Sequence, residues 1–468
     1  MARRTAALHR QRNGCRPGLV HRLRGHLFDR RALRSRLAPQ PRLRRIPERP
    51  NREGIVSRAP DTTLFPPVQA PAGTTRLTAA RAADYGTHQT TFGPLPAHTD
   101  SAALLAALRD SGLEGRGGAG FPAWRKLAAV PARERARRRR VVVIGNAAEG
   151  EPLSQKDATL LLRSPHLVID GLLTVAGALG AHSVYLYAQA SVLEAVGRAL
   201  AERADAAGIE LREAAESFIS GEASAVVNAL AGREPVPQDR TVRLTESGLG
   251  GRPTLLHNVE TLAHIALIAR FGAAWFRSVG TKGDPGTRLV TVGSDGHPST
   301  VLEVAGGSRI GDVLRFTGVD TGTLSAVLVG GYHGAWLPAY ALEARLDRAD
   351  LAGFGANPGA GILMGLGERR CPITVAAAVA TYLAGETAGQ CGPCVNGLPA
   401  MAAVLRRLAR GDRDPGLPGE VRRLAAIVTG RGSCNHPDGT ARFVLSTLTV
   451  FADDVAAHLA GHCRKDHR

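Results

Sequence analysis

Cysteine is scarce in this sequence, with 6 residues in a chain of 468. So few cysteines exclude a disulfide-stabilised secreted scaffold, and their gathering toward the C-terminus favours metal binding in a reducing, cytoplasmic setting. Long uncharged apolar runs are also lacking, so we expect no direct membrane insertion, only peripheral association through a complex. At roughly 100–200 residues per domain, the length predicts several domains that each bury a core.

The excess of basic residues is confined to the N-terminus. The chain carries 59 Lys+Arg against 41 Asp+Glu, for a net charge of +18. Residues 1–50 hold 15 Arg and two acids, Asp29 and Glu48, which leaves 44 basic and 39 acidic residues elsewhere, a net charge of only +5. Because the body of the chain has this ordinary balance, we do not expect nucleic acid as a partner.

We predict that residues 1–70 form a disordered, Arg-rich extension, because they lack sustained periodicity and lead into a Pro-rich stretch. Three interpretations of this extension remain open. It is an extension without function or a misassigned start, an Arg-rich transit peptide, or a tail for nucleic acid or another anionic surface.

Apolar patterning predicts three ordered domains. Strand and helix patterns alternate from VVVIG at residues 141–145 onward, which indicates a parallel sheet in an α/β domain over residues 75–282. Short β-rich runs separated by turn residues follow in a smaller domain over residues 283–366. Four amphipathic segments then predict a four-helix bundle over residues 367–463.

Four polar motifs lie in the first of these domains. The glycine loop EGRGGAGFP, residues 114–122, lets backbone N–H groups approach a phosphate or a flat ring. The motif NAAEGEP, residues 146–152, follows a buried strand, where open parallel sheets bind ligands. The others are FISGEASA at 218–225 and GLGGRPT at 248–254, which leads into HNVET at 257–261. Each alone is compatible with a turn or a helix cap, but their order and spacing together are not generic.

A fifth motif, GQCGPC, places Cys391 and Cys394 three residues apart at the start of a helix, and Cys434 lies 40 residues after Cys394. Such thiolates suit an iron–sulfur cluster, which needs four soft ligands. Taken alone, a C-x-x-C pair is also typical of a zinc site or a redox pair.

In this order, the motifs resemble those of the NADH-oxidising flavoprotein subunit of respiratory complex I, known as the F subunit, and its relatives in NAD-reducing hydrogenases and formate dehydrogenases. The resemblance covers roughly residues 75–462 and rests on GRGGAGFP, NAAEGEP, GEASA and GGRPTLLHNVET. It implies an α/β multidomain fold with a Rossmann-like FMN domain, a β-grasp soluble-ligand-binding domain and a C-terminal four-helix bundle. It also implies FMN, NAD(H) and a 4Fe–4S cluster as cofactors. The implied partners are other electron-transfer subunits, such as a thioredoxin-like 2Fe–2S subunit or a ferredoxin.

The resemblance implies specific cofactor contacts in this chain. The glycine loop would face FMN and the nicotinamide ring, Lys126 would lie near the flavin or phosphate, Glu151 would contact NADH, and Asn258 and Thr261 would bind the phosphate end. No side chain is expected to act as a catalytic acid or base, because hydride passes between two cofactors. The full implied set is Gly115, Arg116, Gly117, Gly118, Ala119, Gly120, Phe121, Lys126, Asn146, Glu149, Glu151, Gly221, Glu222, Asn258 and Thr261.

The cluster motif departs from the family pattern at Ala388, where the family has its first cysteine. We therefore expect Cys391, Cys394 and Cys434 as three ligands and Cys371 as the first candidate for the fourth. The alternatives are Cys463, a ligand other than cysteine, or a three-iron cluster. His436 is expected to be a surface or capping histidine.

The nucleotide site departs from the pattern as well, at Ala148, Phe218, Ala223 and His257. Each lost hydrogen bond to a charged group costs about 1.5–3 kcal/mol, so two losses weaken nucleotide binding by roughly 100-fold or more. The primary prediction is a subunit that takes hydride from NADH and passes single electrons through the cluster to a partner. The alternatives are an electron-transfer subunit with another donor, such as a ferredoxin, and a redox-inactive scaffold.

Overall fold

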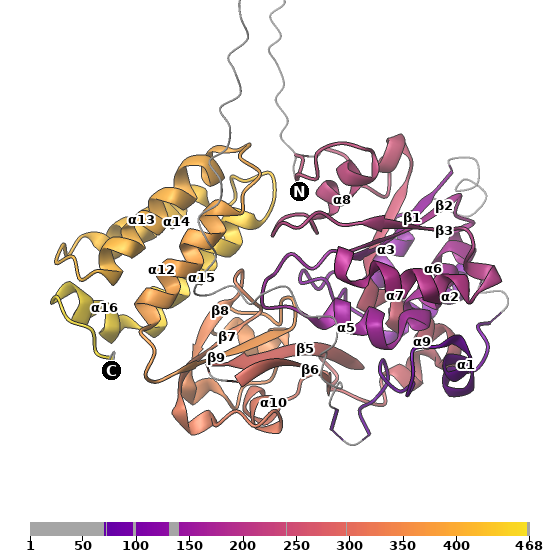
Figure 1. The fold of residues 1–468 in the computed structure, drawn as a ribbon, viewed down its shortest axis with the longest axis horizontal. Coiled ribbons are helices and arrows are strands. Elements are labelled where there is room, and N and C mark those ends of the chain that lie inside the picture. Colours follow the sequence, from indigo (N-terminus) through magenta and orange to yellow (C-terminus); the bar gives the residue numbers. More distant parts are fainter. Residues whose placement is uncertain are drawn as a thin grey trace, which may run out of the picture. The chain divides into compact units, whose positions relative to one another are not determined.

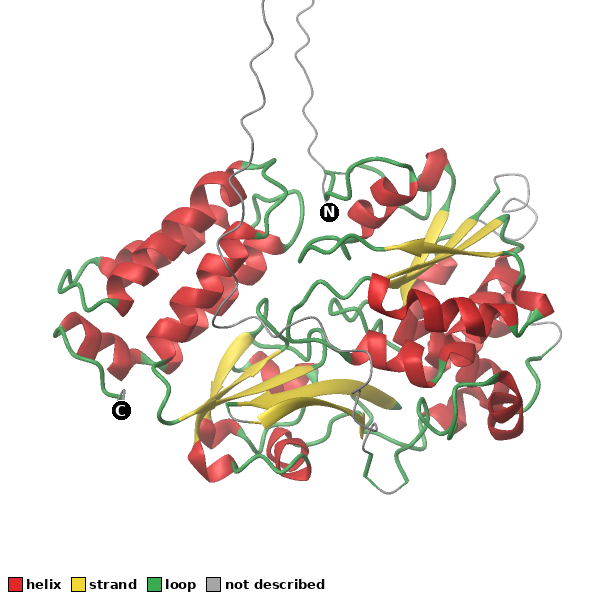
Figure 2. Cartoon of the chain, in the orientation of Figure 1, coloured by secondary structure: helices red, strands yellow, loops and turns green. Residues whose placement is uncertain are grey.

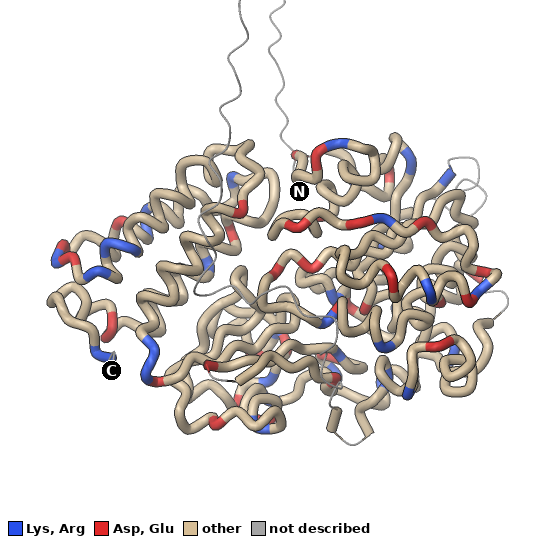
Figure 3. Tube along the Cα trace, in the orientation of Figure 1, with Lys and Arg blue, Asp and Glu red and all other residues tan. Residues whose placement is uncertain are grey.

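The computed structural model describes residues 70–71, 73–96, 100–130, 140–239, 241–295 and 297–465. The predicted Arg-rich extension therefore lies, apart from its last residue, outside the described residues. Figure 3 shows basic and acidic positions interspersed along the described part of the chain.

A four-stranded parallel sheet with the order β3-β2-β1-β4 forms the first part of the fold. Both of its faces are covered, because Val143 packs in the core that contains α6 and α9, whereas Val142 and Ile144 pack with Val226 of α8. This arrangement is Rossmann-like. The strands are β1 (Val142–Ala147), β2 (Ser183–Ala188), β3 (Ile209–Glu213) and β4 (Thr254–Asn258).

The helices of this part surround the sheet, as Figure 2 shows. The helix Ala190–Ala201 gives way to a 3₁₀ turn at Ala204–Ala206. The helices are α1 (Tyr85–Phe92), α2 (Ser101–Ser111), α3 (Ala123–Ala128), α5 (Lys156–Arg163), α6 (Pro165–Leu179), α7 (Ala190–Ala201), α8 (Ala223–Leu230) and α9 (Val259–Phe276).

A second, mixed sheet has the order β6-β5-β9-β7-β8, in which β5 and β9 are parallel and the other pairs are antiparallel. It has its own core with α10 (Ile310–Phe316) and α11 (Arg348–Ala352), as a β-grasp domain requires. The strands are β5 (Thr287–Ser294), β6 (His297–Ala305), β7 (Leu324–Val329), β8 (Ala335–Pro338) and β9 (Ile362–Gly367).

The remaining chain is helical, and α12 packs on α13, α13 on α14 and α14 on α15 around one apolar core (Figure 1). Together they form the predicted four-helix bundle. The helices are α12 (Pro372–Gly385), α13 (Leu398–Ala409), α14 (Leu417–Val428), α15 (His436–Val450) and the short α16 (Ala452–Leu459), with a π-helical turn η5 at Pro393–Gly397.

One described helix, α9, is long and apolar enough to cross a membrane by length and composition, and the bent pair α5 and α6 passes only if it is counted as one span. The sequence predicted no such segment. In the structure, α9 packs against α2, α6 and the first sheet, and 61% of its apolar window is buried. Its apolar character therefore accompanies burial in the core.

Candidate functional site

The polar motifs meet at the carboxyl edge of the first sheet. Asn146 ends the pairing of β1 with β4, and its register partner on β4 is Asn258. The chain runs from β1 outward to β2 and β3 on one side and returns to β4 on the other, so the strand order reverses between β1 and β4. Ligands of open parallel sheets bind at this kind of reversal.

The two asparagines hold the surrounding loops together. Asn146 donates through Nδ2 to the Gly221 carbonyl at 3.0 Å and accepts through Oδ1 from the Ala148 N–H. Asn258 caps α9 by accepting from the Glu260 N–H, and its Nδ2 donates to Asp157 at 2.6 Å. These residues therefore position the second, third and fourth motifs relative to one another.

The glycine loop closes between α2 and α3. The Gly115 N–H donates to the Phe121 carbonyl at 2.9 Å, and the Arg116 N–H donates to Thr261 Oγ1 at 2.9 Å. Gly118 and Gly120 have φ values of 100° and 57°, a backbone conformation that is strained for residues with a side chain. The loop is thus a backbone-lined surface fixed against the start of α9.

Further contacts hold the loop against the sheet edge and the second sheet region. A Cβ on Gly117 would lie 3.2 Å from Asn258, which brings the loop directly against the end of β4. The Arg116 side chain is buried and binds Asp284 at 3.2 Å, so its guanidinium anchors the loop to the second sheet region. The Ala119 carbonyl accepts from Arg348 of α11 at 2.6 Å.

A cavity of about 540 Å³ opens beside this loop. Its volume lies in the usual range for cofactor sites. Phe121 presents a ring that is 45% exposed there, and Lys126 lines the wall with its ammonium 3.3 Å from the Leu256 carbonyl. Other walls come from Ala223, Arg125, Ala129, Arg243, Leu244, Thr245, Thr254 and Leu255.

One half-buried ammonium and one buried imidazole lie near the cavity. Burial lowers the pKa of Lys126. His257 is 3% exposed, its Nε2 has no hydrogen-bond partner within the described residues, and burial together with nearby Lys126 lowers its pKa to about 3. A phosphate beside these groups would supply the missing acceptor. The exposed Phe121 ring, the Lys126 ammonium and the His257 imidazole fit FMN.

The three acidic residues predicted to contact cofactors have protein partners in the structure. Glu149 accepts from the N–H groups of Asp157 and Ala158 at the start of α5. Glu222 caps α8 by accepting from the Ser224 and Ala225 N–H groups. Both carboxylates therefore act on helix starts, and the start of α8 borders the cavity through Ala223.

Glu151 faces the second sheet. Its Oε2 accepts from the Tyr332 N–H at 2.8 Å, and a Cβ on Gly331 would lie 2.5 Å from the same oxygen. Burial raises the pKa of Glu151 to about 8. This carboxyl therefore stabilises the contact between the first domain and the β7–β8 turn.

A buried network of ion pairs, which the sequence did not predict, lies beneath the site. Lys156 Nζ lies 2.6 Å from Asp157 and 2.9 Å from Glu260, and all three side chains are almost fully buried. Burial opposes the charge on Lys156, but the two carboxylates raise its pKa above the ordinary value. A signal was present, because only 4 of the 59 basic residues are lysines and Lys126 and Lys156 are two of them.

A second cavity gathers the three motif cysteines. Cys391, Cys394 and Cys434 line it together with Ala388, which stands where the family has a cysteine. Burial and the neighbouring Cys391 raise the pKa of Cys394 to about 12, so this thiol needs a bound cation to ionise. Three thiols around one cavity fit an iron–sulfur cluster with three protein thiolates.

Cys371 does not join these thiols. It caps the start of α12, whereas Cys391 follows the end of this 14-residue helix, which is about 21 Å long. This geometry does not support Cys371 as the fourth cluster ligand. Cys463, the second candidate, lies with Cys371.

His436 corrects another expectation, because it is neither at the surface nor a cap. It is 2% exposed, lines the cysteine cavity, and contacts the Leu383 carbonyl at 2.8 Å and His333 at 3.0 Å.

One short segment borders both cavities. Ile219 lines the cysteine cavity and Ala223 lines the cavity beside the glycine loop. Four residue steps span at most about 14 Å. Gly221 in the middle leaves no room for a side chain, since a Cβ there would lie 2.8 Å from the Ala148 carbonyl oxygen.

The fold and these two cavities define a class of proteins: Rossmann-like flavin-binding chains with a β-grasp domain and a cysteine-bearing helical bundle. The sequence matches the models of the Nuo51 FMN-binding domain over residues 108–267 and of the NADH-ubiquinone oxidoreductase-F iron-sulfur binding region over residues 374–458. The chain thus carries regions of both kinds and is similar to NADH-quinone oxidoreductase F subunits along most of its length.

Similar proteins support this assignment. The second F subunit of the NADH-quinone oxidoreductase of Rhizobium meliloti is 28% identical over 375 residues, which cover 76% of this chain and 88% of the relative. The F subunit of the Escherichia coli enzyme is 28% identical over 377 residues, covering 76% and 84%. A chain of an air-oxidised NAD+-reducing NiFe hydrogenase superposes with a TM-score of 0.70 at 31% identity, covering 78% of this chain. This chain spans 64% of that hydrogenase chain.

Proposed function

We propose that this chain is an electron-transfer subunit that oxidises NADH through FMN and passes single electrons to an iron–sulfur cluster. The observation that carries the proposal is the segment Ile219–Ala223, which borders the flavin-sized cavity at one end and the cysteine cavity at the other. Bound FMN would supply the chemistry that accepts a hydride and releases electrons one at a time.

The side chains of this protein would bind and orient rather than transfer protons. Lys126 and His257 would hold the FMN phosphate, because Lys126 lines the cavity, His257 is buried close to Lys126, and His257 Nε2 lacks a partner within the described residues. The backbone of Gly115–Gly120 would lie along the cofactor, and Asn146, Glu149, Gly221, Glu222, Asn258 and Thr261 would fix the surrounding loops. Phe121 would cover one side of the cavity and exclude water.

Cys391, Cys394 and Cys434 would hold the cluster, with the fourth coordination position open at Ala388. We also propose that the subunit works in a reducing cytoplasm within a larger complex, beside a thioredoxin-like 2Fe–2S subunit or a ferredoxin. The sheets and the helical bundle support domain limits near residues 75–282, 283–366 and 367–463, with β9 ending at Gly367.

An electron donor other than NADH is a second candidate function. Glu151, which would contact NADH, is bonded to the Tyr332 N–H, and Ala148 and Ala223 replace acidic residues of the family pattern. A site with these features would bind the nucleotide more weakly.

Anaerobic purification, absorption and low-temperature EPR spectra, and titration with NADH test the proposal. We expect flavin absorption that NADH bleaches, followed by a reduced-cluster EPR signal. Bleaching by dithionite alone would favour the other donor, and a colourless protein that cannot be reconstituted would contradict both functions.

A further inference from the structure

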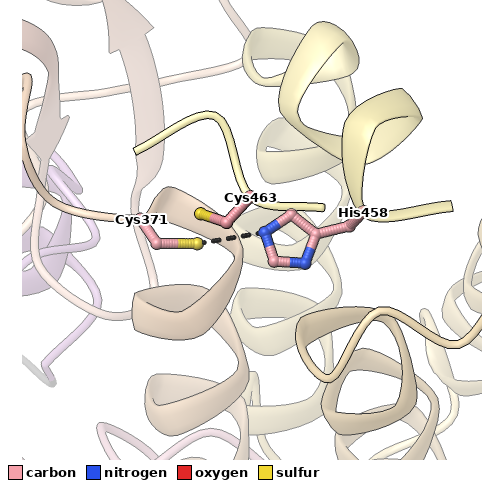
Figure 4. A group of neighbouring side chains, drawn as sticks. All are labelled: Cys371, His458 and Cys463. Atoms are coloured by element: carbon pink, nitrogen blue, oxygen red, sulfur yellow. Dashed lines mark hydrogen bonds between the residues drawn. The ribbon is translucent and has the colours of Figure 1, made fainter. Parts of the chain in front are cut away.

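A third group of side chains lies at the start of α12, whereas the cysteine cavity lies beyond the other end of this helix. Cys371, His458 and Cys463 each direct one ligand atom into a common space, and these atoms all lie within 4.8 Å of one another (Figure 4). Cys371 Sγ is 3.2 Å from His458 Nε2. The residues come from the start of α12, the end of α16 and the turn after it, so the fold brings together positions 87 residues apart.

The histidine is oriented for metal binding. His458 Nδ1 lies 3.1 Å from the Leu408 carbonyl, which fixes the proton on Nδ1 and leaves Nε2 facing the thiols. Metal-binding histidines are usually held in this way by a partner on the other ring nitrogen. His458 is 4% exposed, so the site is shielded from bulk water.

The first thiol lies at the start of a helix. Cys371 is the N-cap of α12, and its Sγ accepts from the Thr374 N–H at 3.4 Å. Cys463 is half-buried and gives a second sulfur ligand next to the first.

A carboxyl oxygen without a hydrogen-bond partner in the described residues lies one helical turn before His458. Asp454 precedes His458 by one helical turn on α16, so the two side chains share a face of the helix. Asp454 is 7% exposed, and its Oδ1 has no hydrogen-bond partner within the described residues. A buried carboxylate oxygen without a partner is costly unless a cation or donor satisfies it.

We propose that Cys371, His458 and Cys463 bind a zinc ion, with Asp454 or a water molecule in the fourth position. Two thiolates and an imidazole are typical zinc ligands, whereas magnesium and calcium prefer oxygen. Tetrahedral zinc places such ligand atoms roughly 3.3–3.8 Å apart, so small side-chain movements complete the site. Each thiol releases one proton as its sulfur bonds to zinc, and nothing is oxidised or reduced.

The ion would fasten the C-terminal turn to the start of α12. It is independent of the iron–sulfur cluster, because the motif cysteines lie beyond the other end of the helix. The competing use of the two sulfurs is a Cys371–Cys463 disulfide, and the experiment separates the two.

The test is metal analysis of the full-length holoprotein, purified under reducing, anaerobic conditions from cells supplied with zinc. We expect about one zinc per chain in addition to iron. Cys463→Ser, at a half-exposed position that folding tolerates, should lose nearly all the zinc and keep the iron. Asp453→Asn is the matched control, because Asp453 neighbours Asp454 but its side chain is 86% exposed. It should keep both metals.

A second measurement uses cobalt as the probe. Co²⁺ added to metal-stripped, reduced protein should give the thiolate charge-transfer band and the visible bands of a tetrahedral site, and both should be absent in Cys463→Ser. Equal zinc in the wild type and Cys463→Ser would overturn the proposal. So would a reduced wild-type protein that binds neither metal, or a Cys371–Cys463 disulfide found by mass spectrometry in the anaerobic protein.

Discussion

The cavity beside the glycine loop and the cysteine cavity respond differently to departures from the family pattern. At the sheet edge, Ala148 and Ala223 replace acids, yet the loops stay in place because Asn146 bonds Gly221 and the Ala148 N–H. In the cysteine cavity, Ala388 replaces one ligand, and a main-chain amide does not supply the metal-binding sulfur that is lost. Backbone amides can substitute for side-chain hydrogen bonds, but only a soft donor can substitute for a thiolate.

Removing a second thiol should have the largest effect. Cys394→Ser leaves two motif cysteines, so we expect iron per chain to fall nearly to zero while bound flavin persists. Ser433→Ala, at a cavity residue with no thiol, is the control and should keep its iron. Iron and flavin assays measure both, and iron retained in Cys394→Ser would show that the cysteine cavity is not the cluster site.

Removing the Lys126 ammonium from the cavity beside the glycine loop should have the next largest effect. Lys126→Met keeps the length of the side chain but loses a charge-assisted hydrogen bond, so FMN affinity should fall about 10- to 100-fold. Fluorescence titration of the apoprotein measures it. Arg125→Met is the control, because Arg125 also lines the cavity but its guanidinium lies over the Trp124 ring. Equal losses in both variants would argue for a general charge effect.

Restoring the missing thiol should sharpen the contrast between the cavities. Ala388→Cys supplies a fourth sulfur to the same cavity, so we expect cluster loss in air to slow by a few-fold. The loss is followed by the decay of cluster absorption. An unchanged rate would mean that another ligand already occupies the fourth position.

The smallest effect concerns pH and the buried imidazole. His257 is neutral in the folded protein, with a pKa of about 3 against an ordinary value of 6.5. Unfolding therefore takes up a proton below pH 6.5, and the free energy of unfolding should decline as pH falls from about 6.5 toward 3, by up to about 1.4 kcal/mol per pH unit.

Denaturant unfolding of FMN-free protein at a series of pH values tests this dependence. His257→Asn should show a shallower decline than the wild type. His182→Asn removes an exposed histidine and should leave the decline unchanged. A wild-type slope in His257→Asn would assign the dependence to other buried histidines.

The sequence predicted the parts of the site that local patterns encode. The strand VVVIG and the motif that follows it lie where expected, because apolar runs and polar turns are local signals. Pairings across long separations were not visible. Arg116 binds Asp284 and His436 contacts His333, so a loop arginine and a histidine expected at the surface are both buried by distant partners.

The expectation for Cys371 failed for a geometric reason. Seventeen residues of sequence separate Cys371 from Ala388, and this proximity along the chain suggested proximity in space. The intervening residues form a straight, stiff helix, which holds its ends apart. Helix length, once known, would have ruled out the pairing.

The segment Ile219–Ala223 separates the cavity beside the glycine loop from the cysteine cavity. Its centre is locked, since Gly221 packs on the Ala148 carbonyl and Glu222 caps α8. A displacement of this segment at one cavity must therefore displace the residues that line the other cavity. Binding of either cofactor should therefore restrain the residues that line the other cavity.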